Sequence, residues 1–213
     1  MIKSMLAAAA LILTGAAQDT RAPDAEAFVE SNAQSVIETL QALQDGERNL
    51  DEVRADFRDR IDRLADVERI SNFVLGRYRR TASEEELEAF RETFREYAIS
   101  VYETELTNYA GQTLSVTGSV TRSPGDYVVR SEVTGGPDGR TYDVNWRVLE
   151  ADGELQVLDA QVFGVWLAQT QREQILSIIG NNRGQVSAAT EALNARLENS
   201  TSQTADASQG RGE

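Results

Sequence analysis

The chain has 213 residues, a formal net charge of −14 at pH 7, and neither cysteine nor histidine. The absence of these two residue types excludes disulfides, thiol chemistry, histidine-based zinc sites and Ser-His catalysis. The acidic balance excludes non-specific nucleic-acid binding, which depends on neutralising phosphates with Lys and Arg.

The first 17 residues have the features of a secretory signal peptide. Lys3 provides a positive start, an apolar and Ala-rich run extends from Met5 to Leu13, and Gly15-Ala16-Ala17 supplies small residues before a cleavage site. The apolar run is too short to span a bilayer, and no later stretch approaches eighteen consecutive apolar residues. We therefore predict export and a soluble mature protein that begins at Gln18. Without Lys3, 20 arginines face 35 acidic residues, so the mature charge is −15.

Apolar residues at helical spacing predict four helices in the first half of the mature chain. The first helix begins at Pro23-Asp24 and ends near Leu43, and shorter helices follow over about 50–64 and 66–76. Ser83 and Glu86 have the spacing of a capping box, in which each side chain accepts a hydrogen bond from the other residue's backbone N–H. This box opens the longest helix, about 84–109, which carries an apolar stripe.

Four strands are expected next. Apolar and polar residues alternate over 114–120, 127–133 and 142–148, and short turn sequences rich in Gly, Pro and Asp separate these runs. The fourth run, 155–167, breaks the alternation, so its inward set stays undetermined, and Gly164 indicates a bulge within it. The pattern predicts an antiparallel meander with one buried and one wet face.

Two further helices, about 168–179 and 185–199, complete the predicted fold. Helices first, strands second and helices last indicate an α+β class rather than βαβ units. The length suits a single domain over 18–199. Residues 200–213 have almost no apolar content, and we predict a disordered tail.

Three segments carry a resemblance to a known family. The sequence Phe73–Ala82, FVLGRYRRTA, is similar to the signature of the MlaC family, periplasmic phospholipid-binding proteins of Gram-negative bacteria that are also called toluene-tolerance proteins. Tyr109-Ala-Gly-Gln112 stands where that family has a Tyr-x-Gly-Gln element. Val157–Leu167, followed by Arg172 and Gln174, resembles the family's later block. The resemblance covers roughly Asp24 to Leu197.

The resemblance implies both a fold and a function. The fold would be an NTF2- or cystatin-like, curved, four-stranded antiparallel sheet wrapped by helices, with lipid tails between the sheet and the helices and the headgroup outside. The protein would carry a glycerophospholipid across the periplasm, between an outer-membrane lipoprotein–porin complex and an inner-membrane ABC transporter complex, and so maintain outer-membrane lipid asymmetry. It would do no covalent chemistry and need no cofactor, metal or nucleotide.

The residue pattern alone does not separate a lipid pocket from a protein core, because acyl chains and core side chains are equally apolar. The pattern by itself favours a core, and the resemblance favours a pocket lined by the longest helix and the inward face of the sheet. The residues expected to contact lipid are Phe73, Phe94, Tyr97, Val101, Val129, Tyr142, Val144, Trp146, Val165, Leu167 and Ile175.

Polar residues leave further alternatives open. Arg77, Arg79 and Arg80 form the densest basic cluster, either a contact with a headgroup phosphate or a transporter, or a solvated helix end that pairs with nearby acids. Asp159 forms either an ion pair with Arg172 or, together with a Tyr, acid–base machinery of an isomerase type. Besides the lipid carrier, the open functions are therefore a small-molecule enzyme on an NTF2-like fold and an envelope adaptor without a ligand. At Arg79 the family typically has Trp. It more often has Trp, Ser, Tyr and Phe at Leu155, Trp166, Gln171 and Ile175.

Overall fold

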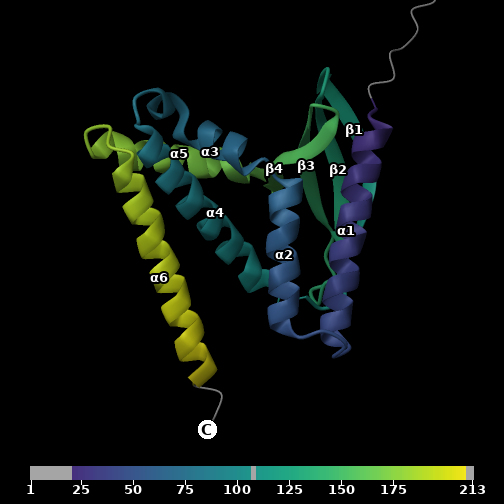
Figure 1. Ribbon diagram of the computed structural model, residues 1–213. Helices are drawn as coiled ribbons and strands as arrows, with labels where there is room; N and C mark the ends of the chain where they lie inside the picture. Colours follow the sequence, from purple (N-terminus) through teal and green to yellow (C-terminus); the bar gives the residue numbers. More distant parts are fainter. Residues whose placement is uncertain (1–20, 107–108, 210–213) are drawn as a thin grey trace, which may run out of the picture.

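The computed structural model describes residues 21–106 and 109–209, so the predicted signal peptide lies outside the described residues. Helices come first, strands second and helices last, which confirms the predicted α+β class (Figure 1). The elements are α1 (Pro23–Gln44), α2 (Leu50–Leu64), α3 (Val67–Leu75), the 3-10 helix η1 (Gly76–Arg80), α4 (Glu84–Leu106), β1 (Thr113–Ser123), β2 (Asp126–Thr134), β3 (Tyr142–Ala151), β4 (Glu154–Val162), β5 (Val165–Trp166), α5 (Leu167–Asn181) and α6 (Ser187–Gln209).

The strands form one antiparallel sheet in the order β1-β2-β3-β4-β5. Four strands were predicted, whereas the described residues contain five. The difference arises in the fourth run, where Phe163 and Gly164 have φ angles of +51° and +79° and turn the chain back. Val165 thereby pairs with Val162 as the start of a short fifth strand. Gly164 thus belongs to a tight turn and not to a bulge in a continuous strand. The more specific likeness to an NTF2 or cystatin sheet stays a prediction.

The predicted alternation of the middle strands is confirmed. Val129 lies opposite Trp146 across β2 and β3, and opposite residues in such a pair share one face of the sheet. Trp146 is fixed on this inner face because its indole N–H donates a hydrogen bond of 3.0 Å to Ser131 Oγ. On the outer face, Arg147 donates two hydrogen bonds to the carboxylate of Asp126.

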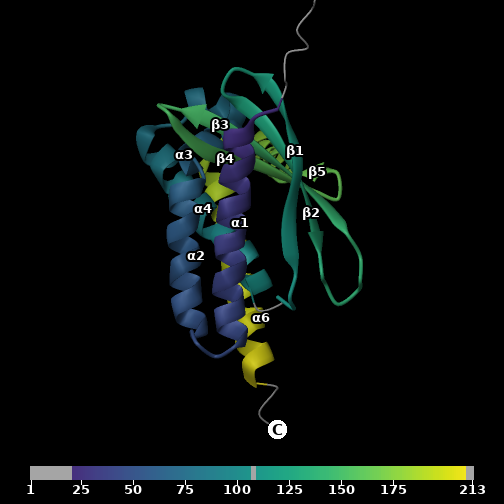
Figure 2. The same cartoon turned by 90° about the vertical axis from the view of Figure 1, so that its right-hand side faces the viewer.

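The helices form two groups. α1 runs alongside β1 with α2 next to it, and both lie over the inner face of the sheet (Figures 1 and 2). α3, α4, α5 and α6 form the second group, in which α4 contacts mainly α6 and α3 contacts mainly α5. The expectation that the longest helix faces Tyr142, Val144 and Trp146 is therefore corrected. Its apolar stripe meets other helices, because periodicity defines a face and does not choose the partner of that face.

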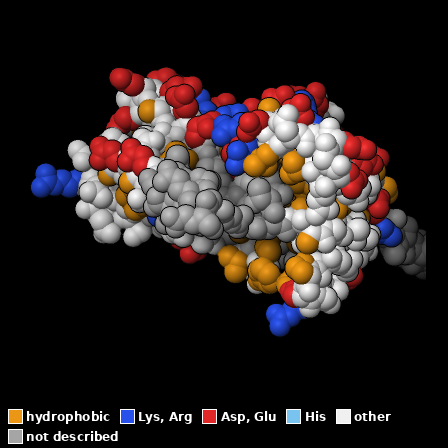
Figure 3. All heavy atoms as spheres, turned by 90° about the horizontal axis from the view of Figure 1, so that it is seen from below, with side chains coloured by type: hydrophobic (Ala, Val, Ile, Leu, Met, Phe, Trp, Pro, Cys, Tyr) orange, Lys and Arg blue, Asp and Glu red, His pale blue; other side chains and the backbone are white. Residues whose placement is uncertain are grey.

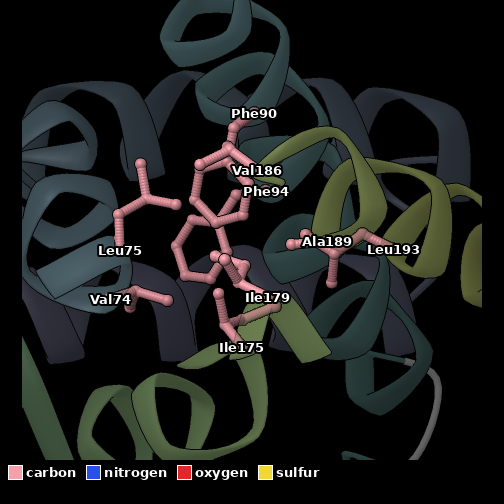
Figure 4. Close-up of a cluster of buried hydrophobic side chains, with 9 residues drawn as sticks. All are labelled: Val74, Leu75, Phe90, Phe94, Ile175, Ile179, Val186, Ala189 and Leu193. Carbon is pink, nitrogen blue, oxygen red and sulfur yellow. The ribbon is translucent and has the colours of Figure 1, made fainter. Parts of the chain in front are cut away.

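Each group has its own core. In the helical core the rings of Phe90 and Phe94 stack with centroids 5.7 Å apart. Figure 4 shows this core, whose buried residues are Val74, Leu75, Phe90, Phe94, Ile175, Ile179, Val186, Ala189 and Leu193. A second core lies between α1 and the sheet and contains Ala22, Ala25, Val29, Val129 and Val148. The group that contains α1 and α2 is thus built around the sheet, and the group of α3, α4, α5 and α6 is built around contacts between helices.

The start of α4 agrees with the predicted capping, whereas the end of α6 differs from its predicted position. Ser83 N–H donates to Glu86 Oε2 at 2.9 Å and Glu86 N–H donates to Ser83 Oγ at 3.2 Å, so the predicted capping box is confirmed. α6 continues to Gln209, beyond the predicted end at Asn199 and into the segment predicted to be disordered. Neither Gly nor Pro interrupts 200–209, and Ala and Gln favour helix. In the described part of the chain, no helix combines the length and the apolarity needed to cross a bilayer.

Candidate functional site

A cavity of about 570 Å³ lies between α1, α2 and the inner face of the sheet. This volume is within the range of roughly 300–1,000 Å³ that is typical of small-molecule sites. Its wall is made of Phe28, Val29, Asn32, Ala33, Val36, Ile37, Leu40, Phe57, Arg60, Ile61, Leu64, Ala65, Tyr109, Gln112, Thr113, Leu114, Val133, Trp146 and Val157.

Local periodicity explains why the wall is apolar. The contributions of α1 recur in pairs every four residues, which keeps them on one side of a helix. α2 contributes Phe57, Ile61 and Leu64 at spacings of four and three. Leu114 and Val133 are cross-strand partners, so they face the same side of the sheet. Apolar side chains at these helical and strand spacings usually fill a protein core, whereas here they surround a cavity.

One edge of the cavity is polar. Among the described residues that line the cavity, Arg60 alone carries a charge. Its guanidinium donates to Asp56 Oδ2 at 2.9 Å on the same helix and to Ser35 Oγ at 2.9 Å on α1. Burial acts to raise the pKa of Asp56, but the hydrogen bond and charge of Arg60, together with the charge of Arg48 and a hydrogen bond from Thr39, hold this pKa below its usual value. The pair therefore stays ionised at neutral pH and joins α1 to α2.

Residues just before β1 form another part of the cavity wall. Gln44 Nε2 donates to the Tyr109 carbonyl at 2.7 Å, which ties this segment to the end of α1. The Tyr109 hydroxyl is buried and has no hydrogen-bond partner among the described residues. Tyr109 lines the cavity, so a polar atom of a ligand could supply this missing partner.

Of the eleven residues predicted to contact lipid, only Trp146 lines the cavity. Phe94 and Ile175 are buried in the helical core, with Phe73 and Tyr97 packed against it. Val129 and Val144 are buried on the inner face, Val101 and Val165 are exposed, Leu167 is partly buried, and Tyr142 packs on Phe163.

Sequence reasoning missed the contribution of α1 and α2. Their apolar residues served to predict the helices, but none of them was included among the residues expected to contact lipid. The signal that could have indicated the cavity is that α2 has more apolar side chains than its contacts in the protein core bury. Val53 alone is buried among the residues of α2, although this helix carries Phe57, Ile61 and Leu64 on the same side.

The basic cluster lies on η1, and none of its members lines the cavity. Arg77, Arg79 and Arg80, here called the η1 arginines, are all exposed. Arg77 lies over the Tyr78 ring and donates to its hydroxyl at 2.9 Å. Glu86, one of the acids expected to pair with this cluster, is instead used in the capping box of α4. The cluster is therefore available at the surface, but it does not form part of the cavity.

Asp159 and Arg172 have separate structural roles. Asp159 Oδ1 accepts 2.8 Å hydrogen bonds from the backbone N–H groups of Ala160 and Ala168, which ties β4 to the first turn of α5. Burial is the main influence on this carboxyl and raises its pKa, although the backbone hydrogen bonds act in the opposite direction. Arg172 donates to the Phe73 carbonyl and lies over the Phe73 ring at 4.9 Å. The structure thus gives each residue a different partner from the predicted ion pair.

The segment around Gly76 explains part of the sequence signature. Gly76 has a φ of +55° and ends α3, and the guanidinium of Arg172 lies against its Cα. Phe73, Gly76 and Arg172 therefore form one packed unit that joins α3 to α5. In the described part of the chain, no group of three or more acidic side chains is arranged to hold a metal ion.

Comparison with known proteins places this geometry in context. A family model described as MlaC protein matches residues 30–195. Among solved structures, the chain is similar to a phospholipid-binding protein from Ralstonia solanacearum in complex with a phospholipid. The two share 24% sequence identity and a TM-score of 0.71, and the match covers 83% of this chain and 98% of that chain. A search of curated proteins gives no match.

Proposed function

The chain belongs to the MlaC family, and from this premise we propose that it is a periplasmic phospholipid carrier whose cavity holds the acyl tails. The observation that carries the proposal is the apolar cavity between α1, α2 and the sheet. The Ralstonia protein of similar fold was solved with a phospholipid, which supports the same class of ligand here.

The size of the cavity supports occupation by an apolar ligand. In engineered protein cores, empty space destabilises the fold by about 24 cal/mol per Å³. The cavity here is open to solvent, so without a ligand water would occupy it. Water is a poor substitute, because an apolar wall offers few hydrogen-bond partners. A hydrocarbon chain removes this penalty.

The ligand's own energetics also require burial. Each methylene transferred from water is worth about 0.8 kcal/mol, so two ordinary acyl chains amount to some 20 kcal/mol or more. A carrier must come close to this value to compete with a bilayer. The headgroup stays outside, since the wall is mostly apolar and Arg60, its charged residue among the described lining, is already paired with Asp56.

The finer role follows the family. The carrier takes phospholipid between an outer-membrane lipoprotein–porin complex and an inner-membrane ABC transporter complex, and it performs no covalent chemistry. An enzyme of the acid–base type considered above would need a carboxyl group directed into the cavity, together with a tyrosine. The described lining contains no carboxylate, and Asp159 bonds backbone N–H groups instead. A ligand-free adaptor would need a filled core.

The test is lipid analysis combined with a cavity-filling variant. Freshly purified protein is expected to yield phospholipid on solvent extraction and mass spectrometry. Ala33→Trp places a large ring in the cavity and should expel lipid while the fold persists. Gln34→Trp, at an exposed neighbouring position of α1, is the matched control and should retain lipid. Bare wild-type protein, or full lipid occupancy in a folded Ala33→Trp variant, would contradict the proposal.

A further inference from the structure

An apolar patch is exposed at the turn between β4 and β5. Phe163 is 75% exposed and Val165 is 50% exposed, although both are large apolar side chains. The Phe163 ring meets the edge of Tyr142, with centroids 5.2 Å apart and an interplanar angle of 82°. We call these three residues the turn patch.

The backbone at the turn patch is strained at Phe163, the residue whose side chain is 75% exposed. Phe163 has a φ of +51°, a conformation that residues with a Cβ atom adopt rarely and unfavourably. The turn has its own hydrogen bond, 3.1 Å from Gln161 Nε2 to the Gly164 carbonyl, and the phenyl ring takes no part in it. A glycine would suit this backbone better. Backbone strain of this kind is a reason to look for function.

The turn patch continues the wall of the cavity. Leu114 lies opposite Val133, and Val133 lies opposite Tyr142, so these side chains form one row across the inner face of the sheet. Leu114 and Val133 line the cavity, and Tyr142 contacts Phe163. An apolar row thus leads from the cavity to the surface. Seen from below, hydrophobic side chains gather near the middle of the molecule, while acidic ones crowd the upper edge of the view (Figure 3).

The charge around the turn is unusual for this chain. Residues 160–171 contain no charged side chain, whereas 26% of all residues are charged and the net charge is −14. Asp138 adds an acidic group beside the turn patch, because its carboxylate accepts a hydrogen bond from the Tyr142 hydroxyl. A neutral segment can approach a membrane surface without the repulsion that the rest of the chain experiences. Aromatic side chains such as Tyr142 and Trp166 also suit the headgroup region, where one end of the ring is wet and the other apolar.

The size of the turn patch decides between two classes of partner. A stable protein interface needs about 800 Å² on each side, which one short turn does not provide. Partial insertion into a bilayer needs only a few apolar side chains and stays weak and reversible.

We propose that the turn patch inserts into the interfacial region of a lipid bilayer and forms the apolar passage by which a phospholipid tail moves between the bilayer and the cavity. This inference rests on the proposed carrier function. It adds a direct contact with the membrane surface to the contacts with protein complexes.

The experiment is co-flotation of the full mature chain with neutral phosphatidylcholine vesicles. Phe163→Gly removes the ring and relieves the strained backbone, and Val165→Ser removes the second side chain. The double variant is expected to bind vesicles at least roughly ten-fold less, because ten-fold is about the change for withdrawing a single large apolar side chain from hydrocarbon and this variant withdraws two. Val120→Ser, at a valine that is 40% exposed on β1, is the matched control and should bind like the wild type. Vesicles containing phosphatidylglycerol should bind the wild type more weakly, because of the acidic net charge.

Three outcomes would overturn the proposal. If wild-type protein does not float with vesicles, the turn patch does not bind a bilayer and a protein partner is the alternative. Equal binding by the double variant, or an equal loss in Val120→Ser, would remove the patch from membrane contact. Circular dichroism confirms the fold of each variant, and the Phe163→Gly backbone should be no less stable than wild type. Lipid extraction from the same preparations is read separately, so failure of the carrier function shows as bare wild-type protein, whatever the vesicles bind.

Discussion

Replacing Gly76 by alanine should destabilise the fold far more than a similar change at another left-handed glycine. A Cβ atom at Gly76 would come within 2.8 Å of Arg172 Nη2 and 3.0 Å of its Cζ, and the φ of +55° is unfavourable for any residue with a side chain. Gly46 has a φ of +73° with no atom within 4 Å of a Cβ, so Gly46→Ala reports backbone strain alone.

The expected magnitude follows from the contacts that Arg172 would lose. Backbone strain at positive φ costs about 1–2 kcal/mol in Gly46→Ala, and at least as much in Gly76→Ala, where a φ of +55° is combined with a ψ of −123°. Displacing Arg172 at Gly76 also removes its hydrogen bond to the Phe73 carbonyl, about 1.5–3 kcal/mol for a charged donor, and its stacking on the Phe73 ring, about 0.5–1 kcal/mol. Gly76→Ala should therefore lower the free energy of unfolding by about 3–6 kcal/mol, and Gly46→Ala by about 1–2 kcal/mol.

Urea denaturation of both variants at equal lipid content measures the difference, because bound ligand itself adds stability. Arg172→Ala completes a double-mutant cycle. With the guanidinium gone, Gly76→Ala should cost only the backbone strain, so the two single effects should not add. The reasoning is refuted if Gly76→Ala is no more destabilising than Gly46→Ala, or if the cycle is additive.

The remaining predictions concern the cavity wall, acid stability and the basic cluster. Val133→Glu, on the wall, should expel lipid and leave a folded domain, whereas Val144→Glu, buried at 8% exposure, should unfold it; native mass spectrometry and circular dichroism distinguish the two results. The hydrogen bond from Arg95 holds the pKa of Asp62 below 3.8, so this pair stabilises the fold above that pH and loses its effect as pH falls through the lowered pKa. Asp62→Asn should accordingly reduce the loss of stability in acid. Urea titrations from about pH 5 to about pH 2, a range that brackets the ordinary pKa, measure the unfolding free energy as a function of pH. Equal pH dependence in wild type and variant would exclude the pair as a cause. Alanine at all three η1 arginines should leave fold and lipid content unchanged. If the cluster steers docking, on-rates to the inner-membrane complex should fall at low salt and recover at high salt, and unchanged on-rates would mark it as a solvated helix end.

Local signals in the sequence were sufficient for most of the elements. Ser83 and Glu86 marked the start of α4 because a capping box satisfies backbone groups within one helical turn. Alternation placed Trp146 on the inner face because successive residues of a strand point to opposite sides. The fifth strand was missed because left-handed backbone at Phe163 is unusual for that residue type, and nothing in a propensity argument predicts it.

The candidate site depended on information that such patterns do not contain. Phe94 and Ile175 were predicted to contact lipid, whereas the structure buries them in a core of helices. Ala33 and Val133 belong to segments 100 residues apart and meet across the cavity only in the folded chain.

By itself the sequence determined the α+β order, the apolar face of each element and the resemblance to a family. Tertiary structure decided which of these faces meet, and where they fail to meet. A periodicity of 3.6 or 2 residues defines a face relative to its own helix or strand, because it arises from the local backbone geometry. Whether two such faces close into a core or stand apart around a cavity depends on the distance between elements. That distance is set by all their packing partners together: the sheet that supports α1, the ion pairs that hold α2, and the helical core that draws α4 away from the sheet.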